Sequence, residues 1–176
     1  MTVSNPVSVI VPVKNAASTL ERCILALLGQ DYSDGFEVIM VDNGSRDGSS
    51  EILQRWQGSL RLSTTIKPGA SVARNEGIRL ACYPWLAFTD ADCYPDPDWL
   101  SALMCSIVNG EPADFIGGRI QAYRPSTDVE YFMDRLYNQQ EAIEAYCHPY
   151  AISANLLVRR SLFEVIGPFN EALDYP

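Results

Sequence analysis

The chain has 176 residues, 47% of them hydrophobic and 20% charged, a composition typical of one globular domain or of one domain with part of a second. Its 13 basic and 22 acidic residues give a net charge of −9, which argues against binding nucleic acid or an anionic membrane through bulk charge. No apolar run approaches the roughly 18 residues of a membrane span. The first residues lack a basic segment followed by an apolar stretch, so we expect no signal peptide.

The five cysteines are odd in number and include no Cys-x-x-Cys pair. This usage is typical of reduced thiols, so we expect a cytoplasmic protein. Cys93 lies among acidic residues, and we expect it to be a packing thiol because a hard metal ion does not select sulfur.

Apolar runs and amphipathic stretches alternate along the first two thirds of the chain. Four runs predict strands: residues 7–13, 36–41, 60–66 and 85–89. Each is followed by helical spacing, in residues 18–29, from about residue 50, in residues 71–82 and in residues 96–108. Ser18 and Glu21 match a capping box, and Asp96-Pro97 offers an N-cap with a first-turn proline. This alternation predicts an α/β fold with a largely parallel sheet.

The pattern changes after residue 113. Residues 114–123 predict a strand element, residues 128–146 a long amphipathic helix, and residues 151–158 another strand. A short helix should then end at Gly167. We therefore expect two subdomains, residues 1–113 and 114–176, within one compact unit.

Polar residues follow all four early strands: Lys14, Asp42 with Asn43, Lys67, and Asp90 with Asp92. Because parallel strands end at the same edge of a sheet, and ligands bind beyond that edge, these residues should converge on a site. No G-x-G-x-x-G follows the first strand, which argues against a dinucleotide-binding Rossmann site. No G-x-x-x-x-G-K-[ST] occurs, so a P-loop is excluded.

Asp90 and Asp92 come directly after the buried run of residues 85–89. Carboxylates that leave a buried strand are costly unless a cation meets them. Mg²⁺ or Mn²⁺ is the obvious candidate, since such ions take oxygen ligands and bridge carboxylates to phosphates. The alternative is a loop in which Asp92 caps a turn or Asp96 caps the next helix, and the spacing alone does not favour either.

Five segments in this order carry a resemblance: VSVIVPVKN (7–15), VDNGSRDGS (41–49), GASVARNEG (69–77), TDADC (89–93) and ANLLVRR (154–160). Over almost the whole chain the sequence resembles a family 2 glycosyltransferase of the GT-A fold. The resemblance implies a Rossmann-like three-layer αβα sandwich and an inverting, metal-assisted transfer of sugar from a nucleotide sugar. The acceptor would be a glycan or a lipid-linked molecule, such as a cell-surface polysaccharide.

The resemblance also assigns residues to the nucleotide. Pro12 and Lys14 would lie beside the base, and Asp42 with Asn43 would form hydrogen bonds with it. Relatives carry a second aspartate where Asn43 stands, so we take a UDP-sugar as the first candidate and leave GDP and TDP open. Arg74 would lie near the diphosphate or hold the metal-site carboxylates.

The remaining assignments concern the metal and the sugar. Asp92 would bind Mn²⁺ or Mg²⁺, and Asp90 would approach the ribose and the metal. Asn155 falls where relatives line the sugar pocket.

The general base is expected elsewhere. In relatives a segment like Phe169-Asn170-Glu171 is soon followed by a Glu-Asp pair that holds the base, and this sequence stops at Pro176. Asp174 is the nearest acid, in a context that does not match. We therefore expect the base beyond Pro176, and a chain that keeps donor binding but transfers little sugar. Peripheral association with the inner face of a membrane, and self-association through residues 128–146, are compatible with this interpretation.

Simpler interpretations stand beside these. Arg74 is otherwise a helix-surface arginine, and Asp42 a turn aspartate that satisfies local amides. For Lys67 a solvated loop is favoured, and for His148 a structural or solvent role. The tyrosines of residues 131–146 are expected to pack in a core or interface rather than to stack on sugar.

Three rival functions remain. A nucleotidyltransferase would need a glycine-rich, arginine-containing loop after the first strand, which residues 12–15 do not supply. An EF-hand Ca²⁺ loop fails because Tyr94 and Pro95 occupy its ligand and glycine positions and Ser101 replaces its terminal glutamate. The third is a relative that binds nucleotide without turnover.

Overall fold

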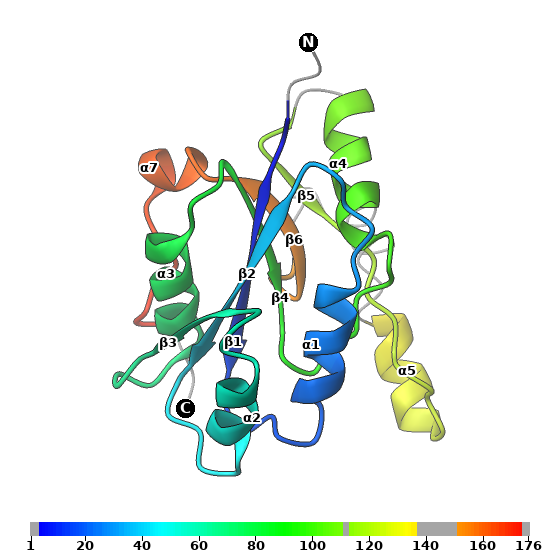
Figure 1. Ribbon diagram of the computed structural model, residues 1–176. Coiled ribbons are helices and arrows are strands. Elements are labelled where there is room, and N and C mark those ends of the chain that lie inside the picture. The colour runs from blue at the N-terminus through cyan, green and yellow to red at the C-terminus, as the bar shows by residue number, and fades with distance from the viewer. Residues whose placement is uncertain (1–3, 111–112, 137–150, 174–176) are drawn as a thin grey trace.

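The computed structural model describes residues 4–110, 113–136 and 151–173 (Figure 1). Within these ranges six strands form one sheet in the order β3-β2-β1-β4-β6-β5. Their bounds are β1 (Val7–Val13), β2 (Phe36–Asp42), β3 (Arg61–Thr64), β4 (Trp85–Thr89), β5 (Phe115–Gly117) and β6 (Asn155–Arg159).

The sheet is largely parallel, as predicted. Strands β3, β2, β1 and β4 pair in parallel, whereas β6 is antiparallel to both β4 and β5. The strand order reverses beside β1, because β2 follows on one side of it and β4 on the other. The carboxyl ends of four strands therefore meet at one edge, next to a topological switch point where α/β proteins bind ligands.

Helices cover both faces of the sheet. Their bounds are α1 (Leu20–Leu28), α2 (Ser49–Arg55), α3 (Ala70–Leu80), α4 (Trp99–Asn109), α5 (Asp128–Leu136) and α7 (Leu162–Ile166). Helices α1, α2 and α4 contribute to one hydrophobic cluster, and α3 and α7 pack against a second (Figure 1). The expected three-layer αβα sandwich is thus confirmed.

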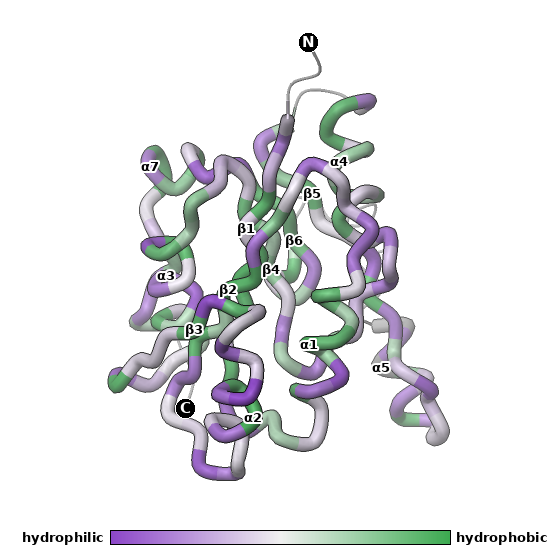
Figure 2. The backbone as a smooth tube through the Cα atoms, viewed as in Figure 1, coloured by the Kyte–Doolittle hydropathy of each residue, from purple (hydrophilic) through white to green (hydrophobic). Residues whose placement is uncertain are grey.

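Strand β1 explains why the sheet forms the centre of the molecule. Val7, Val9, Val11 and Val13 belong to the cluster with α1, α2 and α4, while Ile10 belongs to the cluster with α3. Alternate side chains of a strand point to opposite faces, so a run that is apolar at nearly every position serves both layers. Figure 2 shows that hydrophobic residues predominate in the strands and hydrophilic residues in the outer loops.

Two helix starts differ from the prediction. The capping box at Ser18 is wrong: α1 begins after Thr19, and no side-chain hydrogen bond caps it. Helix α4 begins after Asp98 rather than Asp96, because the amide of Trp99 donates to the carbonyl oxygen of Asp96 and closes a turn before the helix. Sequence patterns place helix ends only to within a few residues.

The later elements are shorter than predicted. The strand expected over residues 114–123 is reduced to β5, and the one expected over residues 151–158 is β6. Of the helix expected over residues 128–146, α5 is the described part, and residues 137–150 lie outside the described ranges.

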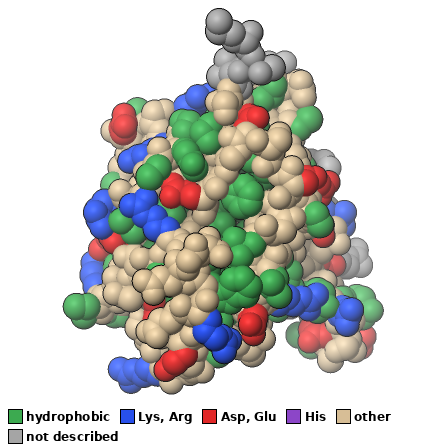
Figure 3. All heavy atoms as spheres, in the orientation of Figure 1, with side chains coloured by type: hydrophobic (Ala, Val, Ile, Leu, Met, Phe, Trp, Pro, Cys, Tyr) green, Lys and Arg blue, Asp and Glu red, His purple; other side chains and the backbone are tan. Residues whose placement is uncertain are grey.

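Helix α5 lies at the margin of the molecule, away from the sheet (Figure 1). Its side chains Val129, Tyr131 and Phe132 are exposed, by 69%, 56% and 64%. In Figure 3 hydrophobic and acidic side chains lie together at the lower right, where Figure 1 places α5. Self-association through this helix stays a prediction. Across the described ranges, none of the helices combines the length and apolar character needed to span a membrane.

Gly77 sets how closely α3 approaches the sheet. A Cβ atom built on Gly77 would lie 2.3 Å from Cγ2 of Ile10, far inside contact distance. We expect Gly77→Ala to lower the free energy of unfolding by about 1–3 kcal/mol, the usual cost of overpacking. Gly58→Ala is the matched control, because a Cβ there meets nothing within 4 Å. Urea denaturation would measure both variants, and equal stability of the two would contradict this account.

Candidate active site

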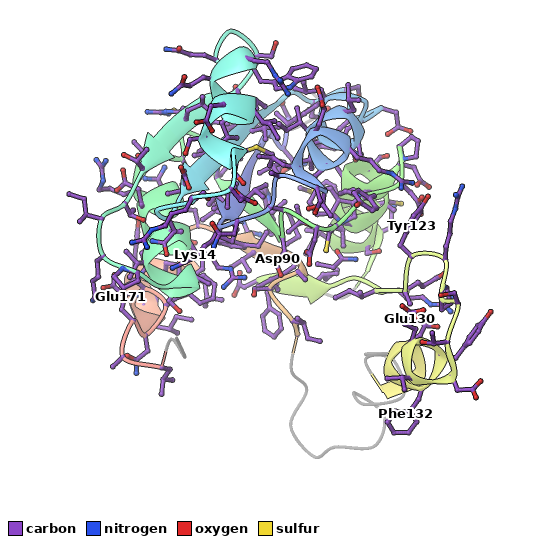
Figure 4. All side chains as sticks on the ribbon, turned by 90° about the horizontal axis from the view of Figure 1, so that it is seen from below. Lys14, Asp90, Tyr123, Glu130, Phe132 and Glu171 are labelled. Atoms are coloured by element: carbon purple, nitrogen blue, oxygen red, sulfur yellow. The ribbon has the colours of Figure 1, made fainter. Side chains whose placement is uncertain are left out.

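A cavity of about 710 Å³ opens at the carboxyl ends of the parallel strands. Its lining includes six residues predicted for the site: Pro12, Lys14, Asn43, Arg74, Asp90 and Asp92. Figure 4 views the molecule from this side and shows Lys14 and Asp90 near each other at the sheet edge. The structure brings Lys14, Asn43, Asp90 and Asp92 together, as the strand-end argument predicted, and places Pro12 and Arg74 beside them. This lining does not include three other candidates: Asp42, Lys67 and Asn155.

Hydrogen bonds join the loops after β1 and β2 into one wall. The amide of Ala17 donates to Asp47 Oδ2 at 2.9 Å, and the amide of Ala16 donates to Ser49 Oγ at 2.9 Å. In return the amide of Arg46 donates to Asn15 Oδ1 at 2.8 Å. Sequence reasoning missed the contribution of Asp47, although its position opposite the end of β1 follows from the parallel pairing of β1 and β2.

Asp42 has local partners. Its Oδ1 accepts a hydrogen bond from the amide of Ser45 at 3.0 Å, and its Oδ2 accepts one from the hydroxyl of Ser50. The residue is buried, with 6% of its surface exposed. The carboxylate thus shapes the turn after β2, which is the simpler of the two roles considered from sequence; its contact with a base stays a prediction.

Asn43 holds the third strand-end loop in place. Its Nδ2 donates to Thr65 Oγ1 at 2.5 Å and to the carbonyl oxygen of Lys67 at 2.7 Å, while its Oδ1 accepts from the amide of Gly69 at 2.7 Å. Gly69 has φ +135°, a conformation that glycine adopts readily and other residues do not. Asn43 therefore fixes the wall of the cavity formed by Pro68 and Gly69.

Arg74 and Asp90 form an ion pair in the floor of the cavity. The distance from Arg74 Nη2 to Asp90 Oδ1 is 2.7 Å, and the two side chains are 12% and 33% exposed. Of the two roles that the resemblance offered for Arg74, the structure shows contact with a site carboxylate. Among the described residues, no group accepts a hydrogen bond from the buried Nε of Arg74. A buried donor without a partner is costly, so it marks a position that a ligand or water would satisfy.

Asp92 is exposed and lines this cavity together with a second one. In the described part of the chain, no three His, Cys, Asp or Glu side chains are grouped to hold a metal ion by themselves. Magnesium sites, however, often use one or two protein carboxylates and complete the coordination with substrate phosphates. Asp90 and Asp92 fit such a site, because both present hard carboxylate oxygens at the cavity wall.

Helix α1 supports the backbone between these aspartates. Thr19 Oγ1 lies 3.0 Å from the carbonyl oxygen of Ala91, and Cys23 Sγ lies 3.7 Å from that of Asp90. Burial raises the pKa of Cys23 to about 12, and the nearby Cys93, Asp92 and Asp90 add to the rise. Sequence reasoning missed Thr19 and Cys23, whose partners lie about seventy residues later in the chain.

The raised pKa of Cys23 leads to a labelling prediction. In mildly alkaline buffer the Cys23 thiol stays protonated and buried, so we expect a maleimide to modify it far more slowly than the exposed Cys82 and Cys105. Peptide mass spectrometry over time would measure each site, with urea-denatured protein as the control in which Cys23 reacts. Rapid modification of Cys23 in the folded chain would show that the buried face of α1 does not stay packed in the core.

The second cavity, of about 610 Å³, lies between the loop after Asp92, helix α4 and residues 116–123. Asn155 lines it and braces its wall: its Oδ1 accepts from Trp99 Nε1 at 2.8 Å, and its Nδ2 donates to the carbonyl oxygen of Arg119 at 2.7 Å. A Cβ atom at Gly118 would lie 2.4 Å from this amide, so the wall requires glycine there. The role of Asn155 in a sugar pocket stays a prediction.

The segment Phe169–Glu171 lies against α3. Asn75 Nδ2 donates to the carbonyl oxygen of Phe169 and to Glu171 Oε1, each at 3.0 Å, and the amide of Phe169 donates back to Asn75 Oδ1 at 2.9 Å. Glu171 also pairs with Lys67, whose side chain is 61% exposed and does not line the cavity, in keeping with the solvated loop favoured from sequence. His148 and Asp174 lie outside the described residues.

The family model for glycosyl transferase family 2 matches residues 8–167, nearly the whole chain. The chain belongs to glycosyl transferase family 2. Glycosyltransferase AglE of Haloferax volcanii is 36% identical over 170 residues, covering 93% of this chain and 55% of that protein. The PGL/p-HBAD biosynthesis glycosyltransferase of Mycobacterium bovis is 30% identical over 172 residues, covering 93% of this chain and 62% of that one. This family 2 chain thus spans little more than half the length of these relatives.

Solved structures agree on the fold of this family 2 chain. S. aureus TarS 1–349 in complex with UDP has a TM-score of 0.75 at 20% identity, covering 96% of this chain and 51% of that one. The mannosyltransferase PcManGT from Pyrobaculum calidifontis, in complex with GDP-Man and Mn²⁺, has a TM-score of 0.72 at 24% identity, covering 97% and 49%. The similarity confirms the expected GT-A fold.

Proposed function

We propose that this chain binds a nucleoside diphosphate sugar, a UDP-sugar as first candidate, and takes part in transferring the sugar to an acceptor hydroxyl. The observation that carries the proposal is the cavity at the strand ends, which is lined by two basic residues, Arg74 and Lys14, and two acidic ones, Asp90 and Asp92. Such a mixed set of charges suits an anionic diphosphate with a divalent cation. The complexes of TarS with UDP and of PcManGT with GDP-Man and Mn²⁺ support the assignment.

The base and ribose would occupy the part of the cavity nearest β1 and β2. Pro12, Lys14 and Asn43 line that part, and the hydrogen-bonded loops behind them hold it rigid. Because the side chain of Asn43 already holds residues 65–69, its contribution to the base would be packing and positioning. Asp42 would contribute indirectly, because its hydrogen bonds to Ser45 and Ser50 hold the turn that follows Asn43.

The diphosphate would lie over Arg74 and the two aspartates. Arg74 orients the carboxylate of Asp90 through their ion pair and contributes positive charge to the floor of the cavity. Asp90 and Asp92 would hold Mg²⁺ or Mn²⁺ together with phosphate oxygens. The bound ion would stabilise the negative charge that develops on the leaving diphosphate.

The acceptor would approach from the second cavity, which shares Asp92 with the first. On this proposal residues 1–113 bind the donor, and the segment from residue 114 onwards begins the acceptor-binding part. Asn155 would line the pocket for the sugar. Inversion needs a general base on the face of the sugar opposite the diphosphate. Asp90 and Asp92 lie on the diphosphate side, so another residue would serve as the base.

A cytoplasmic location accords with the free thiols of the described cysteines, Cys23, Cys82, Cys93 and Cys105. There the acceptor, a glycan or a lipid-linked molecule, would be met in solution or at the inner face of a membrane. Subcellular fractionation of the protein in its source cells would test this assignment.

Calorimetry tests the donor site directly. We expect UDP, titrated into the chain, to bind in the presence of Mn²⁺ and to bind much more weakly in EDTA, with GDP and TDP as the comparison nucleotides. Failure of all three nucleotides to bind, or equal binding in EDTA, would overturn the proposal. Release of UDP from a UDP-sugar would then separate an enzyme from a protein that only binds nucleotide.

A further inference from the structure

The guanidinium group of Arg22 lies between two tyrosine rings. Its Cζ is 4.2 Å from the ring centroid of Tyr94 and 3.9 Å from that of Tyr123. The two rings also touch edge to face, with centroids 5.2 Å apart and an interplanar angle of 79°. A planar cation stacked on aromatic faces is an arrangement that arginine favours and lysine does not reproduce. Three segments far apart in the sequence therefore meet at one side chain.

Each of these segments has a defined place beside the site. Tyr94 follows Asp92 by two residues, in the loop that leaves β4. Tyr123 ends the run of residues 116–123 that walls the second cavity, and Tyr94 lines the same cavity. In Figure 4 Tyr123 lies at the end of the body from which the chain continues to α5. Arg22 is not among the lining residues, so any effect it has on the cavity passes through the two tyrosines.

Helix α1 gives Arg22 a rigid base. Leu20, Cys23, Ile24 and Leu27 of this helix are fully buried in the core. Cys23 of this helix and Thr19, its N-cap residue, contact the backbone of Asp90 and Ala91. Together with the contact of Arg22 to Tyr94, these interactions fix the loop of residues 90–94 at three points along its length.

We propose that Arg22 is a positioning residue that fastens the wall of the second cavity, residues 118–123, to the loop that carries Asp92. The donor cavity and the second cavity share Asp92, so the spacing between them depends on where this wall lies. Without Arg22, residues 118–123 would keep the contacts of Gly118 and Arg119 with Asn155 at one end. At the other end they would keep the hydrogen bond from the Ala122 amide to Asp134 Oδ1, the edge-to-face contact of the two tyrosine rings and the Arg124 contact with Tyr123, but lose both contacts with the Arg22 guanidinium. The claim that this spacing matters for sugar transfer rests on the proposed function. The claim that Arg22 holds the wall in place does not depend on it.

Hydrogen exchange of the chain alone tests the fastening. We expect Arg22→Ala to speed amide exchange in residues 118–124 and 93–96 by about tenfold, the loss of two stacking contacts, and to leave β1 and β2 unchanged. Arg22→Lys should restore only part of the protection, and Tyr123→Leu should reproduce the Arg22→Ala effect. Arg55→Ala, an exposed α2 arginine paired only loosely with Glu21 at 3.6 Å, is the matched control. Unchanged exchange at residues 118–124, or equal acceleration across the chain, would overturn the proposal.

A second measurement addresses the consequence for transfer. In the longest reading frame that carries this sequence, UDP release from UDP-glucose would be followed with water alone and with methyl β-D-glucopyranoside as the acceptor probe. We expect Arg22→Ala to leave the KM for UDP-glucose and the affinity for UDP with Mn²⁺ unchanged, and to lower acceptor-dependent kcat. A raised donor KM with unchanged kcat would contradict a role on the acceptor side. If the parent protein binds no nucleotide, the proposed function fails, while the exchange result still decides whether Arg22 fastens the wall.

Discussion

Replacing Asp92 by asparagine is expected to remove the metal dependence of nucleotide binding and to leave the fold intact. The Asp92 carboxylate is exposed at the junction of the two cavities. Asparagine keeps its shape but lacks the charge that a hard divalent ion requires. We expect the Kd of UDP in Mn²⁺ to rise roughly 100-fold, towards the value that the parent chain shows in EDTA.

Calorimetry with and without Mn²⁺ measures this change, and thermal unfolding checks the fold. Asp128→Asn is the control, because Asp128 lies in the first turn of α5, outside both cavities. A variant that still binds UDP in a Mn²⁺-dependent manner would show that Asp92 is not a metal ligand. A variant that unfolds would favour the alternative from the sequence, in which Asp92 stabilises a turn.

Replacing Arg74 by methionine should reduce both stability and donor turnover. Methionine retains the length of the side chain but leaves the carboxylate of Asp90 without its cation, at an expected cost of about 1–3 kcal/mol in the free energy of unfolding. Turnover of a UDP-sugar should fall by roughly 10²–10³-fold, the usual effect of losing one group that stabilises charge in the transition state.

The double variant Arg74→Met/Asp90→Asn tests the origin of the stability loss. Asparagine removes the unpaired charge, so urea denaturation should show recovered stability. Turnover should stay low in any case, because Asp90 is itself a proposed metal ligand. Arg79→Met is the matched control, because Arg79 lies on the same helix and pairs with Glu76 at an exposed position. Stability that stays low in the double variant would show that the loss comes from the missing Arg74 side chain and not from the unpaired Asp90 carboxylate.

The fold could be predicted from local patterns where a strand serves both faces of the sheet. β1 and β4 are apolar at nearly every position, and their bounds agree with the prediction. The short strands could not be placed as well, because β5 has only three residues and its position depends on pairing with β6. The antiparallel direction of β6 beside β4 also depends on a partner about seventy residues away, which no local pattern encodes.

The location of the candidate site could be predicted from the sequence, but the contacts among its side chains could not. Parallel strands end at one edge, so the convergence of Lys14, Asn43, Asp90 and Asp92 follows from topology. The partners of these side chains do not. The carboxylate of Asp42 accepts hydrogen bonds from Ser45 and Ser50, a few residues later in the chain. Arg22 contacts Tyr94 and Tyr123, and these contacts form only when distant segments pack together.

The central position of β4 in the sheet has a consequence for folding during synthesis on the ribosome. β4 pairs with β1 on one side and with β6 on the other, yet residues 155–159 of β6 leave the ribosome long after residues 85–89. At usual rates of synthesis the free edge of this apolar strand stays bare for on the order of several seconds. Unpaired strand edges can pair with other chains, so this interval favours aggregation of the nascent protein. Slow translation of residues 90–154 should therefore lower the yield of folded protein, even though none of those residues belongs to β4 or β6.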